Sequence, residues 1–381
     1  MNKVLERLNM EAAQKQIPLN ATFELTSNCN MNCRMCYIHR QGMNSPDNYK
    51  PLDFWLSVAE QAKKEGTLVV VVTGGETFLY PHAEELIEKL LGMGFVISLN
   101  TNGTLLDDRR IVWLNENRPA KINISLYGAS DKTYETLCGC KDGFTRVSRA
   151  VDSLLANGHN VYLNGTCVPE NVDDIPEMYN FAKARGLDLH NTSYIFPAGR
   201  YGIHSISDRL SPVEAARADL LMERLQIGEK GLIQRSIKQL ELFDNANSGR
   251  INACGGFHSG DGCSRSNCGG GRNSMAITYD GRMLPCVTNS GISVSLKNKT
   301  LHEAWEELKL KAAETCYPEE CIKCEYQVLC NACPATVFNE TGSYDKVSEY
   351  TCAVIKEKFH ERLNILLEKG VLKADVRQTD M

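Results

Sequence analysis

Cysteine is the residue type in this sequence with the greatest capacity for chemistry, and it is unevenly distributed. The chain contains 16 cysteines, and three of them stand within eight residues, in the run Cys29-Asn-Met-Asn-Cys33-Arg-Met-Cys36. Ten more fall between Cys254 and Cys352. The N-terminus has no apolar export signal, and clustered cysteines in a reducing compartment indicate metal or iron–sulfur ligation rather than a disulfide framework.

The first three cysteines suit an incomplete ligand set. Three thiolates in one loop can hold three irons of a cubane cluster, which has four. The fourth iron is then open to an exogenous chelating ligand, much as a catalytic zinc keeps an open position. A zinc knot with a distant fourth ligand, or buried free cysteines, are the alternatives for the same residues.

Apolar runs alternate with amphipathic stretches from residue 21 to residue 196. Strands are predicted at 21–26, 67–73, 95–100, 121–126, 160–166 and 187–196. Helices are predicted between them at 52–64, 82–91, 107–115, 144–157 and 175–185. This alternation predicts an α/β fold of right-handed βαβ units with a parallel sheet. Six units are too few for a closed eightfold barrel, so we expect an open, partial TIM-like (β/α)6 barrel.

Ligand sites collect at the carboxyl ends of the strands in such barrels. The cysteine loop follows the first predicted strand, and Gly74-Gly75-Glu76 follows the second, so both are expected on that rim. The two glycines would let the backbone take up positive φ and approach a ligand closely. Backbone carbonyls and the Glu76 carboxylate could then accept hydrogen bonds from an ammonium group.

The pattern changes after residue 200. Residues 208–243 look helical and polar, and residues 251–345 are rich in Gly and Cys with one clear strand signal at 274–279. A region with so little apolar periodicity needs bound clusters for its stability. We therefore predict four segments: an N-terminal helix (1–20), the barrel (21–200), a helical linker (201–250), and a small Cys-rich domain ending in a helix (251–381).

The CxxxCxxC loop, placed directly after the first strand, resembles that of the radical SAM superfamily. The resemblance implies that Cys29, Cys33 and Cys36 hold a [4Fe–4S] cluster whose open iron is chelated by S-adenosylmethionine (SAM). The residues that it implies for SAM binding are Met35 near the adenine, Gly74, Gly75 and Glu76 at the methionyl amino group, Ser125 at the ribose, Asn102, and Arg146 at the carboxylate. Tyr127 is a weak catalytic candidate, for which packing is the alternative; turn chemistry and surface charge are the alternatives for Asn102 and Arg146.

The C-terminal cysteine array resembles the SPASM extension of radical SAM enzymes, which holds two auxiliary [4Fe–4S] clusters. By this resemblance one cluster takes Cys321, Cys324, Cys330 and Cys352. The other takes Cys268, Cys286, Cys333 and a fourth ligand, for which Cys263 is the first choice and Cys254 the second. Cys333 stands one residue closer to Cys330 than in the family pattern, and a zinc ribbon is the alternative for the paired cysteines. The cysteines left over, expected to be buried and inert thiols, are Cys138, Cys140, Cys167, Cys254 and Cys316.

The resemblance also implies an activity. Members cleave SAM to a 5′-deoxyadenosyl radical, and auxiliary clusters indicate oxidation of a peptide or protein, by a thioether or carbon–carbon cross-link or at a side chain. The implied partner is an electron donor such as flavodoxin or ferredoxin. Only 28 residues precede Cys29, so a leader peptide is expected to be bound by a separate leader-binding protein or by the barrel. Val287 stands where anaerobic sulfatase maturases carry an Asp, which disfavours that activity. The full cysteine array disfavours a small-molecule radical SAM dehydrogenase or epimerase.

A non-enzymatic iron–sulfur or zinc protein, acting in redox sensing or interaction, is the candidate from another class. It accounts for the cysteines but not for the Gly-Gly-Glu turn or the barrel-like alternation. The formal net charge of −5 argues against nucleic-acid binding. The longest purely apolar run, Leu68–Val72, is too short for a membrane span, so a cytoplasmic protein is predicted.

Overall fold

The computed structural model describes residues 3–38, 45–196, 209–249, 257–258, 264–265, 268–330 and 333–372. Six parallel strands form the centre of the molecule, each paired with the next in chain order. They are β1 (Asn20–Glu24), β2 (Val69–Thr73), β3 (Val96–Thr101), β4 (Lys121–Ser125), β5 (Val161–Thr166) and β6 (Leu189–Thr192). Among the described residues β6 pairs only with β5, so the sheet is not closed. The predicted open (β/α)6 arrangement is confirmed.

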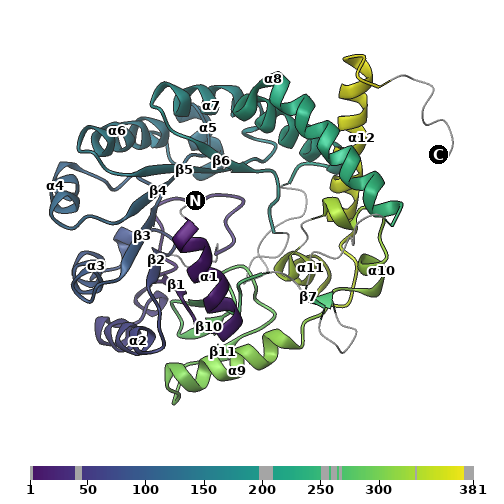
Figure 1. Cartoon of the computed structure of the whole chain (residues 1–381). Coiled ribbons are helices and arrows are strands. Elements are labelled where there is room, and N and C mark those ends of the chain that lie inside the picture. Colours follow the sequence, from purple (N-terminus) through teal and green to yellow (C-terminus); the bar gives the residue numbers. More distant parts are fainter. Residues whose placement is uncertain are drawn as a thin grey trace.

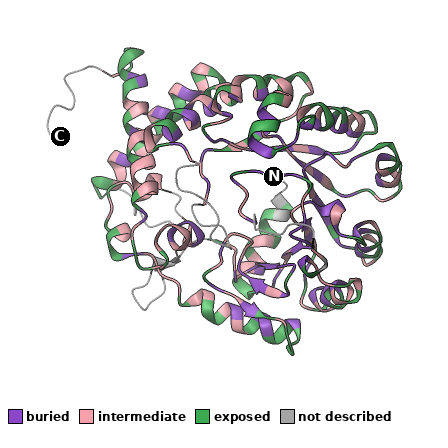
Figure 2. Ribbon diagram, turned by 180° about the vertical axis from the view of Figure 1, so that it is seen from behind, coloured by how far each residue is buried: buried purple, intermediate pink, exposed green. Residues whose placement is uncertain are grey.

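Helices cover the outer face of this curved sheet (Figure 1). They are α2 (Leu52–Lys64), α3 (Ala83–Gly92), α4 (Asp108–Glu116), α5 (Asp131–Cys138), α6 (Gly143–Ala156) and α7 (Ile175–Ala184). The strand residues that face these helices are apolar and fully buried, as at Val70, Leu99 and Ile124, and Figure 2 shows the strands as the buried centre. The alternate residues point to the concave side, and those of β3 to β6 are mostly polar.

The Cys-rich region continues the barrel sheet instead of forming a separate layer. Strand β9 (Ser274–Ile277) pairs in parallel with β1, and β10 (Arg282–Leu284) and β11 (Val294–Ser295) follow in antiparallel order. Cys268 precedes β9 and Cys286 follows β10, so both lie at the amino end of β1. The cysteine loop at residues 29–36 lies beyond the carboxyl end of the same strand, whose five residues span about 16 Å.

The remaining helices are α1 (Lys3–Lys15), α8 (Pro212–Asn247), α9 (Leu301–Ala313), α10 (Glu319–Ile322), α11 (Pro334–Thr341) and α12 (Glu349–Glu368). Helices α8 and α12 lie side by side (Figure 1), and α8 is kinked at Gly228, where φ is 73°. A small hairpin joins β7 (Phe257–His258) to β8 (Ser264–Arg265). None of the described helices is long and apolar enough to cross a membrane.

A buried ion pair fastens the C-terminal helices to the barrel. Arg209, just before α8, lies 2.6 Å from the Glu340 carboxylate on α11, and the two side chains are 9% and 8% exposed. The Tyr194 hydroxyl, which follows β6, donates to the same carboxylate at 2.8 Å. The Arg209 guanidinium also stacks on the Tyr350 ring of α12, 3.5 Å from its centroid. Helices α11 and α12, which carry Cys333 and Cys352, are therefore held to the barrel by one charged cluster.

Glu340→Ala is expected to lower the free energy of unfolding by about 3–5 kcal/mol, because it leaves a buried guanidinium without its carboxylate. Chemical denaturation of the anaerobically purified protein measures this. The matched control is Glu319→Ala, which removes one partner of a pair that is 72% and 75% exposed and should leave stability nearly unchanged. Equal losses in the two variants would show that the Arg209–Glu340 pair is not structurally special.

Candidate functional site

Three cysteine side chains meet at one cavity at the carboxyl rim of the barrel. Cys29, Cys33 and Cys36 line a cavity of about 270 Å³. The predicted site residues that also line it are Met35, Gly74, Gly75, Asn102, Ser125 and Tyr127. The structure thus brings together on one surface the residues that follow β1, β2, β3 and β4.

The cysteine loop is held by the end of a helix that the sequence analysis did not predict. The backbone N–H of Asn32 donates to the carbonyl of Cys138 at 2.8 Å, and that of Arg34 donates to the carbonyl of Leu137 at 3.1 Å. These carbonyls belong to the last turn of α5, where helical carbonyls lack intrahelical partners. Gly139 ends the helix with φ of 65°, a conformation that favours glycine. The C-terminus of α5 therefore fixes the middle of the loop.

The three thiols are set deep in this environment. Burial raises the pKa of Cys29 to about 12. A hydrogen bond with the Cys138 thiol, followed by burial, raises the pKa of Cys33 well above its usual value. The charges of Cys33 and Cys36 act in the same direction on the pKa of Cys29, and all three side chains line the one cavity. Thiolates packed this closely need a compensating cation, so the donor set fits an iron cluster.

Asn102 connects the end of β3 to the cysteine loop. Its Nδ2 donates to Cys29 Sγ at 3.8 Å and to Asn30 Oδ1 at 2.9 Å. Its Oδ1 accepts from the backbone N–H of Thr104 at 3.0 Å and from the Thr104 hydroxyl at 2.7 Å. Because both ends of the amide are engaged, Asn102 is well placed to orient Cys29, and an N–H donor to a ligand sulfur is a common feature of iron–sulfur sites.

The two glycines pack against the cysteine loop itself. Gly75 N–H donates to the Thr26 carbonyl at 2.7 Å, and the Glu76 N–H donates to the Asn28 carbonyl at 2.8 Å. A Cβ on Gly75 would lie 2.4 Å from the Asn28 oxygen, and one on Gly74 would lie 2.7 Å from the Thr26 oxygen. Neither glycine has positive φ, so that expectation was wrong. The absence of a side chain serves the close approach of two backbone segments.

Glu76 lies behind the cavity and does not line it. Its carboxylate is 1% exposed and accepts hydrogen bonds from Asn102 N at 2.7 Å, Thr101 Oγ1 at 2.8 Å and Phe78 N at 3.1 Å. Burial raises its pKa, and these three donors act in the opposite direction. In this structure Glu76 braces the ends of β2 and β3, whereas the sequence analysis expected it to face an ammonium group.

Ser125 and Tyr127 lie on the β4 side of the cavity, and burial raises the pKa of Tyr127. The Tyr134 hydroxyl from α5 accepts from Tyr127 N at 3.1 Å and donates to the Ser125 carbonyl at 3.3 Å, which fixes this turn. Arg146 is not brought to the cavity. It lies on the outer helix α6, where it pairs with Asp142 at 3.4 Å, because this helix packs on the convex side of the sheet.

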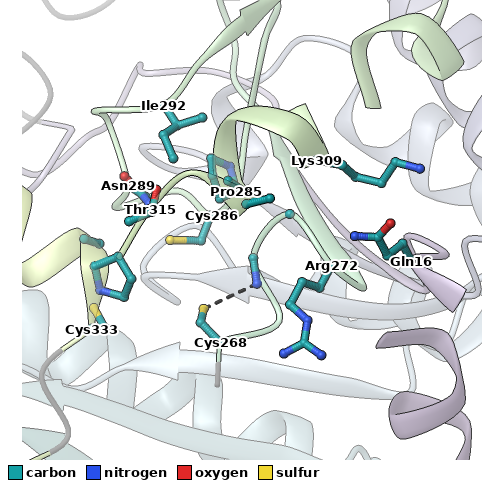
Figure 3. Close-up of a pocket in the computed structure, with 16 residues that line it drawn as sticks. Gln16, Cys268, Arg272, Pro285, Cys286, Asn289, Ile292, Lys309, Thr315 and Cys333 are labelled. Carbon is teal, nitrogen blue, oxygen red and sulfur yellow. Dashed lines mark hydrogen bonds between the residues drawn. The ribbon is translucent and has the colours of Figure 1, made fainter. Parts of the chain in front are cut away.

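A second group of sulfurs lines a different cavity. Cys268, Cys286 and Cys333 surround a space of about 260 Å³ together with Gln16, Arg272 and Lys309, as Figure 3 shows. Burial raises the pKa of Cys268, and the charges of Cys286 and Cys333 act in the same direction. Three cysteines that are up to 65 positions apart in the sequence are therefore neighbours.

Each of these sulfurs has a polar neighbour. The Gly270 N–H donates to Cys268 Sγ at 3.3 Å, the dashed contact in Figure 3. Cys286 Sγ lies 3.3 Å from the Thr288 hydroxyl. Cys333 is the N-cap of α11, and its Sγ accepts from the Thr336 N–H at 3.3 Å. N–H donors and a helix N-terminus both favour thiolate, the form that binds iron.

The third group comprises Cys321, Cys324, Cys330 and Cys352. Burial raises the pKa of Cys321 to about 11, with further contributions from the charges of the other three. The first three stand around α10 and the turn that follows it, and Cys352 comes from α12. The four cysteines of this group, which the resemblance assigns to one auxiliary cluster, are thus linked electrostatically through Cys321. Among the described residues, no three His, Cys, Asp or Glu side chains converge closely enough for a single metal ion.

The other cysteines divide into three kinds. Cys138, Cys140 and Cys167 are buried, as expected, although Cys138 also contacts Cys33. Cys316 is disulfide-bonded, so the expectation of a free thiol was wrong there; sequence spacing does not reveal such a pairing. Cys254 and Cys263, the two candidates for a fourth ligand beside Cys268, lie outside the described residues.

Comparisons with known proteins agree with this geometry. Residues 23–182, from β1 to α7, match the family model of the radical SAM superfamily. An AdoMet-dependent heme synthase of Methanosarcina barkeri is 23% identical over 352 residues, covering 89% of this chain and 97% of the relative. The antilisterial bacteriocin subtilosin biosynthesis protein AlbA of Bacillus subtilis is 23% identical, and the match covers 83% of this chain and 67% of AlbA. The PqqA peptide cyclase of Gluconobacter oxydans is 25% identical, with 81% and 83% covered.

Solved structures match the fold over almost the whole chain. Streptococcus suis SuiB bound to the precursor peptide SuiA superposes with a TM-score of 0.65 at 20% identity, covering 92% of this chain and 82% of SuiB. Native anSMEcpe with bound AdoMet gives a TM-score of 0.66 at 18% identity, covering 93% and 99%. Residues 23–182 therefore match the radical SAM superfamily, and the solved structures show that the fold extends over almost the whole chain, including the Cys-rich region that follows.

Proposed function

We propose that this protein cleaves SAM and oxidatively modifies a peptide or protein. The observation that carries the proposal is the meeting of Cys29, Cys33 and Cys36 with Gly74, Gly75, Asn102 and Ser125 on one cavity at the carboxyl rim. Four strand ends contribute to this surface, which is a typical ligand-binding arrangement for a parallel barrel.

Each of these residues has a part in the proposal. The three cysteines would hold the [4Fe–4S] cluster, with Asn102 orienting Cys29 and the C-terminus of α5 fixing the loop. Met35, 8% exposed, would pack against the adenine, and Ser125 would bond the ribose. When bound, the cluster and SAM supply a 5′-deoxyadenosyl radical that abstracts a hydrogen atom from the substrate. The protein orients the reactants and excludes water around them.

The auxiliary ligand sets would be Cys268, Cys286 and Cys333 with Cys263 or Cys254, and Cys321, Cys324, Cys330 and Cys352. The first set lies at the amino end of β1, the opposite end from the SAM cavity, and is separated from it by the length of that strand. This is a suitable place for a group that removes an electron from the site without contacting SAM. An external donor such as a flavodoxin or ferredoxin would supply the first electron.

Relatives support two substrate classes. AlbA is named as a bacteriocin biosynthesis protein, and the Gluconobacter oxydans relative is named as a peptide cyclase. SuiB was solved with a precursor peptide bound. The heme synthase of Methanosarcina barkeri matches along 97% of its length, so a tetrapyrrole is the second candidate. We favour the peptide because the concave face beside the SAM cavity carries neutral amides and hydroxyls, which suit a peptide better than the carboxylates of a tetrapyrrole.

Cys33→Ala is expected to abolish the formation of 5′-deoxyadenosine from SAM, because the most buried of the three sulfurs is removed. Iron content should fall from about 12 to about 8 atoms per chain, since each cubane holds four irons. Anaerobic reconstitution, iron analysis and chromatography of the products measure both. The control is Cys167→Ala, which removes a buried thiol that does not line the cavity and should preserve activity. Retained 5′-deoxyadenosine formation in the Cys33 variant would refute the assignment.

Gly75→Ala is expected to lower iron occupancy at the cysteine loop while the C-terminal clusters remain. The new Cβ would lie 2.4 Å from a backbone oxygen of the loop, so the loop must move. The matched control is Gly92→Ala, because a Cβ at Gly92 meets nothing within 4 Å. Electron paramagnetic resonance of the reduced proteins separates the clusters. Wild-type spectra and SAM cleavage in Gly75→Ala would show that the backbone contact does not position the loop.

A further inference from the structure

The concave face of the sheet is lined by neutral polar side chains next to the SAM cavity. We call this set the lumen face; its members are Asn100, Asn123, Ser125, Asn164, Thr166 and His190. Asn100, Ser125 and Thr166 also line the cavity, and the other three residues lie on the same face of their strands. The residues between them in β4 and β5 are buried under the helices. Register places Asn100 beside Asn123, Ser125 beside Asn164, and Asn164 beside His190. Neighbouring side chains on one face interact across strands.

The first pair of amides is oriented by hydrogen bonds. Asn123 Nδ2 donates to Asn100 Oδ1 at 2.7 Å and to Ser98 Oγ at 2.9 Å. Both hydrogens of the Asn123 amide are therefore used, and its Oδ1 is fixed as an acceptor. Asn100 accepts at Oδ1 and so keeps its NH2 group as a donor. In the part of the chain that the structure describes, no protein group bonds either of these free ends.

Asn164 extends the same surface by one strand. Its side chain is exposed on β5, a strand that has a partner on each side, so the exposure is on the concave face. The Asn164 amide lies one strand beyond the Asn100 NH2 donor and the Asn123 Oδ1 acceptor. Together they form a surface that suits a ligand group able both to donate and to accept hydrogen bonds. Amides and hydroxyls have this property, whereas carboxylates only accept.

The side chains on the concave face of β1 to β6 that can carry charge near neutral pH are Lys121, His190 and Glu24, which is fully buried at the end of β1. Lys121, which also faces inward from β4, has its ammonium 5.3 Å from the centroid of the Tyr162 ring. His190 is the titratable group of the lumen face. A tetrapyrrole would bring several carboxylates and a broad apolar ring, for which cationic and apolar partners are required. The part of the face that carries Asn100, Asn123, Ser125, Asn164 and Thr166 offers neutral amides and hydroxyls instead.

We infer that the lumen face binds an uncharged substrate residue that both donates and accepts hydrogen bonds, a side-chain amide or a hydroxyl, and selects against carboxylates and tetrapyrroles. The inference rests on the proposed function, and it names the class of residue that is modified. A site built to hydrogen-bond a group rejects analogues that lack it, because its own polar atoms are then left unpaired.

Equilibrium dialysis tests the inference with reconstituted protein and SAM, without reductant so that no turnover occurs. The probes are the N-acetyl amides of Asn, Gln, Ser, Asp and Leu, and iron coproporphyrin III. At least one of the Asn, Gln and Ser probes is expected to have a dissociation constant about tenfold lower than those of the Asp and Leu probes. This is the difference in affinity that about one additional oriented hydrogen-bond pair would give. Asn123→Leu and Asn164→Leu should abolish this preference.

The control is Asn160→Leu, an exposed asparagine just before β5 at the opposite end of the strand, which should keep the preference. Any of four results would overturn the inference. These are preferential binding of the Asp probe or the porphyrin, equal binding of all probes, binding of none, and a preference that survives in both Asn123→Leu and Asn164→Leu. A wild-type preparation that cleaves SAM but shows none of the expected preference would overturn this inference alone, whereas a wild type that does not cleave SAM would overturn the proposed function.

Discussion

The site depends on the contact between two backbone segments at the top of β1 and β2. Residues 26–28 of the cysteine loop accept hydrogen bonds from Gly75 and Glu76, at distances possible only because no side chain intervenes. From the other side, the last carbonyls of α5 receive the loop's N–H groups. Three sulfurs that line one cavity are thus held in place by main-chain bonds, which do not depend on the charge of the thiols.

The same strand that starts this loop also joins the two halves of the molecule. Because β9 adds to β1, the Cys-rich region is anchored to the barrel by a sheet ladder, and its sulfurs fall at a fixed distance from the SAM cavity. The Arg209–Glu340 pair holds α11 and α12 at the far side. A rigid arrangement of this kind suits a protein in which separate redox centres must keep a constant separation.

Much of this could be predicted from sequence, and the failures have physical reasons. The alternation of strand and helix patterns predicted the open barrel, and the structure places Cys29, Cys33 and Cys36 on one cavity and Cys268, Cys286 and Cys333 on another. Helix α5 was missed because it has only eight residues, although its buried residues recur at helical spacing, and it fixes the cysteine loop. The positive φ expected at Gly74 and Gly75 was wrong, because the motif alone does not show that a second backbone segment packs against it. Strand β9 was recognised, but its pairing with β1 is a long-range contact that local sequence does not encode.

The central claim is that the thiols of Cys29, Cys33 and Cys36 hold a cluster with one iron open to SAM. The most direct measurement is electron paramagnetic resonance of the anaerobically reconstituted, reduced wild-type protein, recorded with and without SAM. The account predicts that SAM changes the signal of one cluster and leaves the signals of the others unchanged. A spectrum that does not respond to SAM, or a protein that takes up zinc in place of iron, would contradict it.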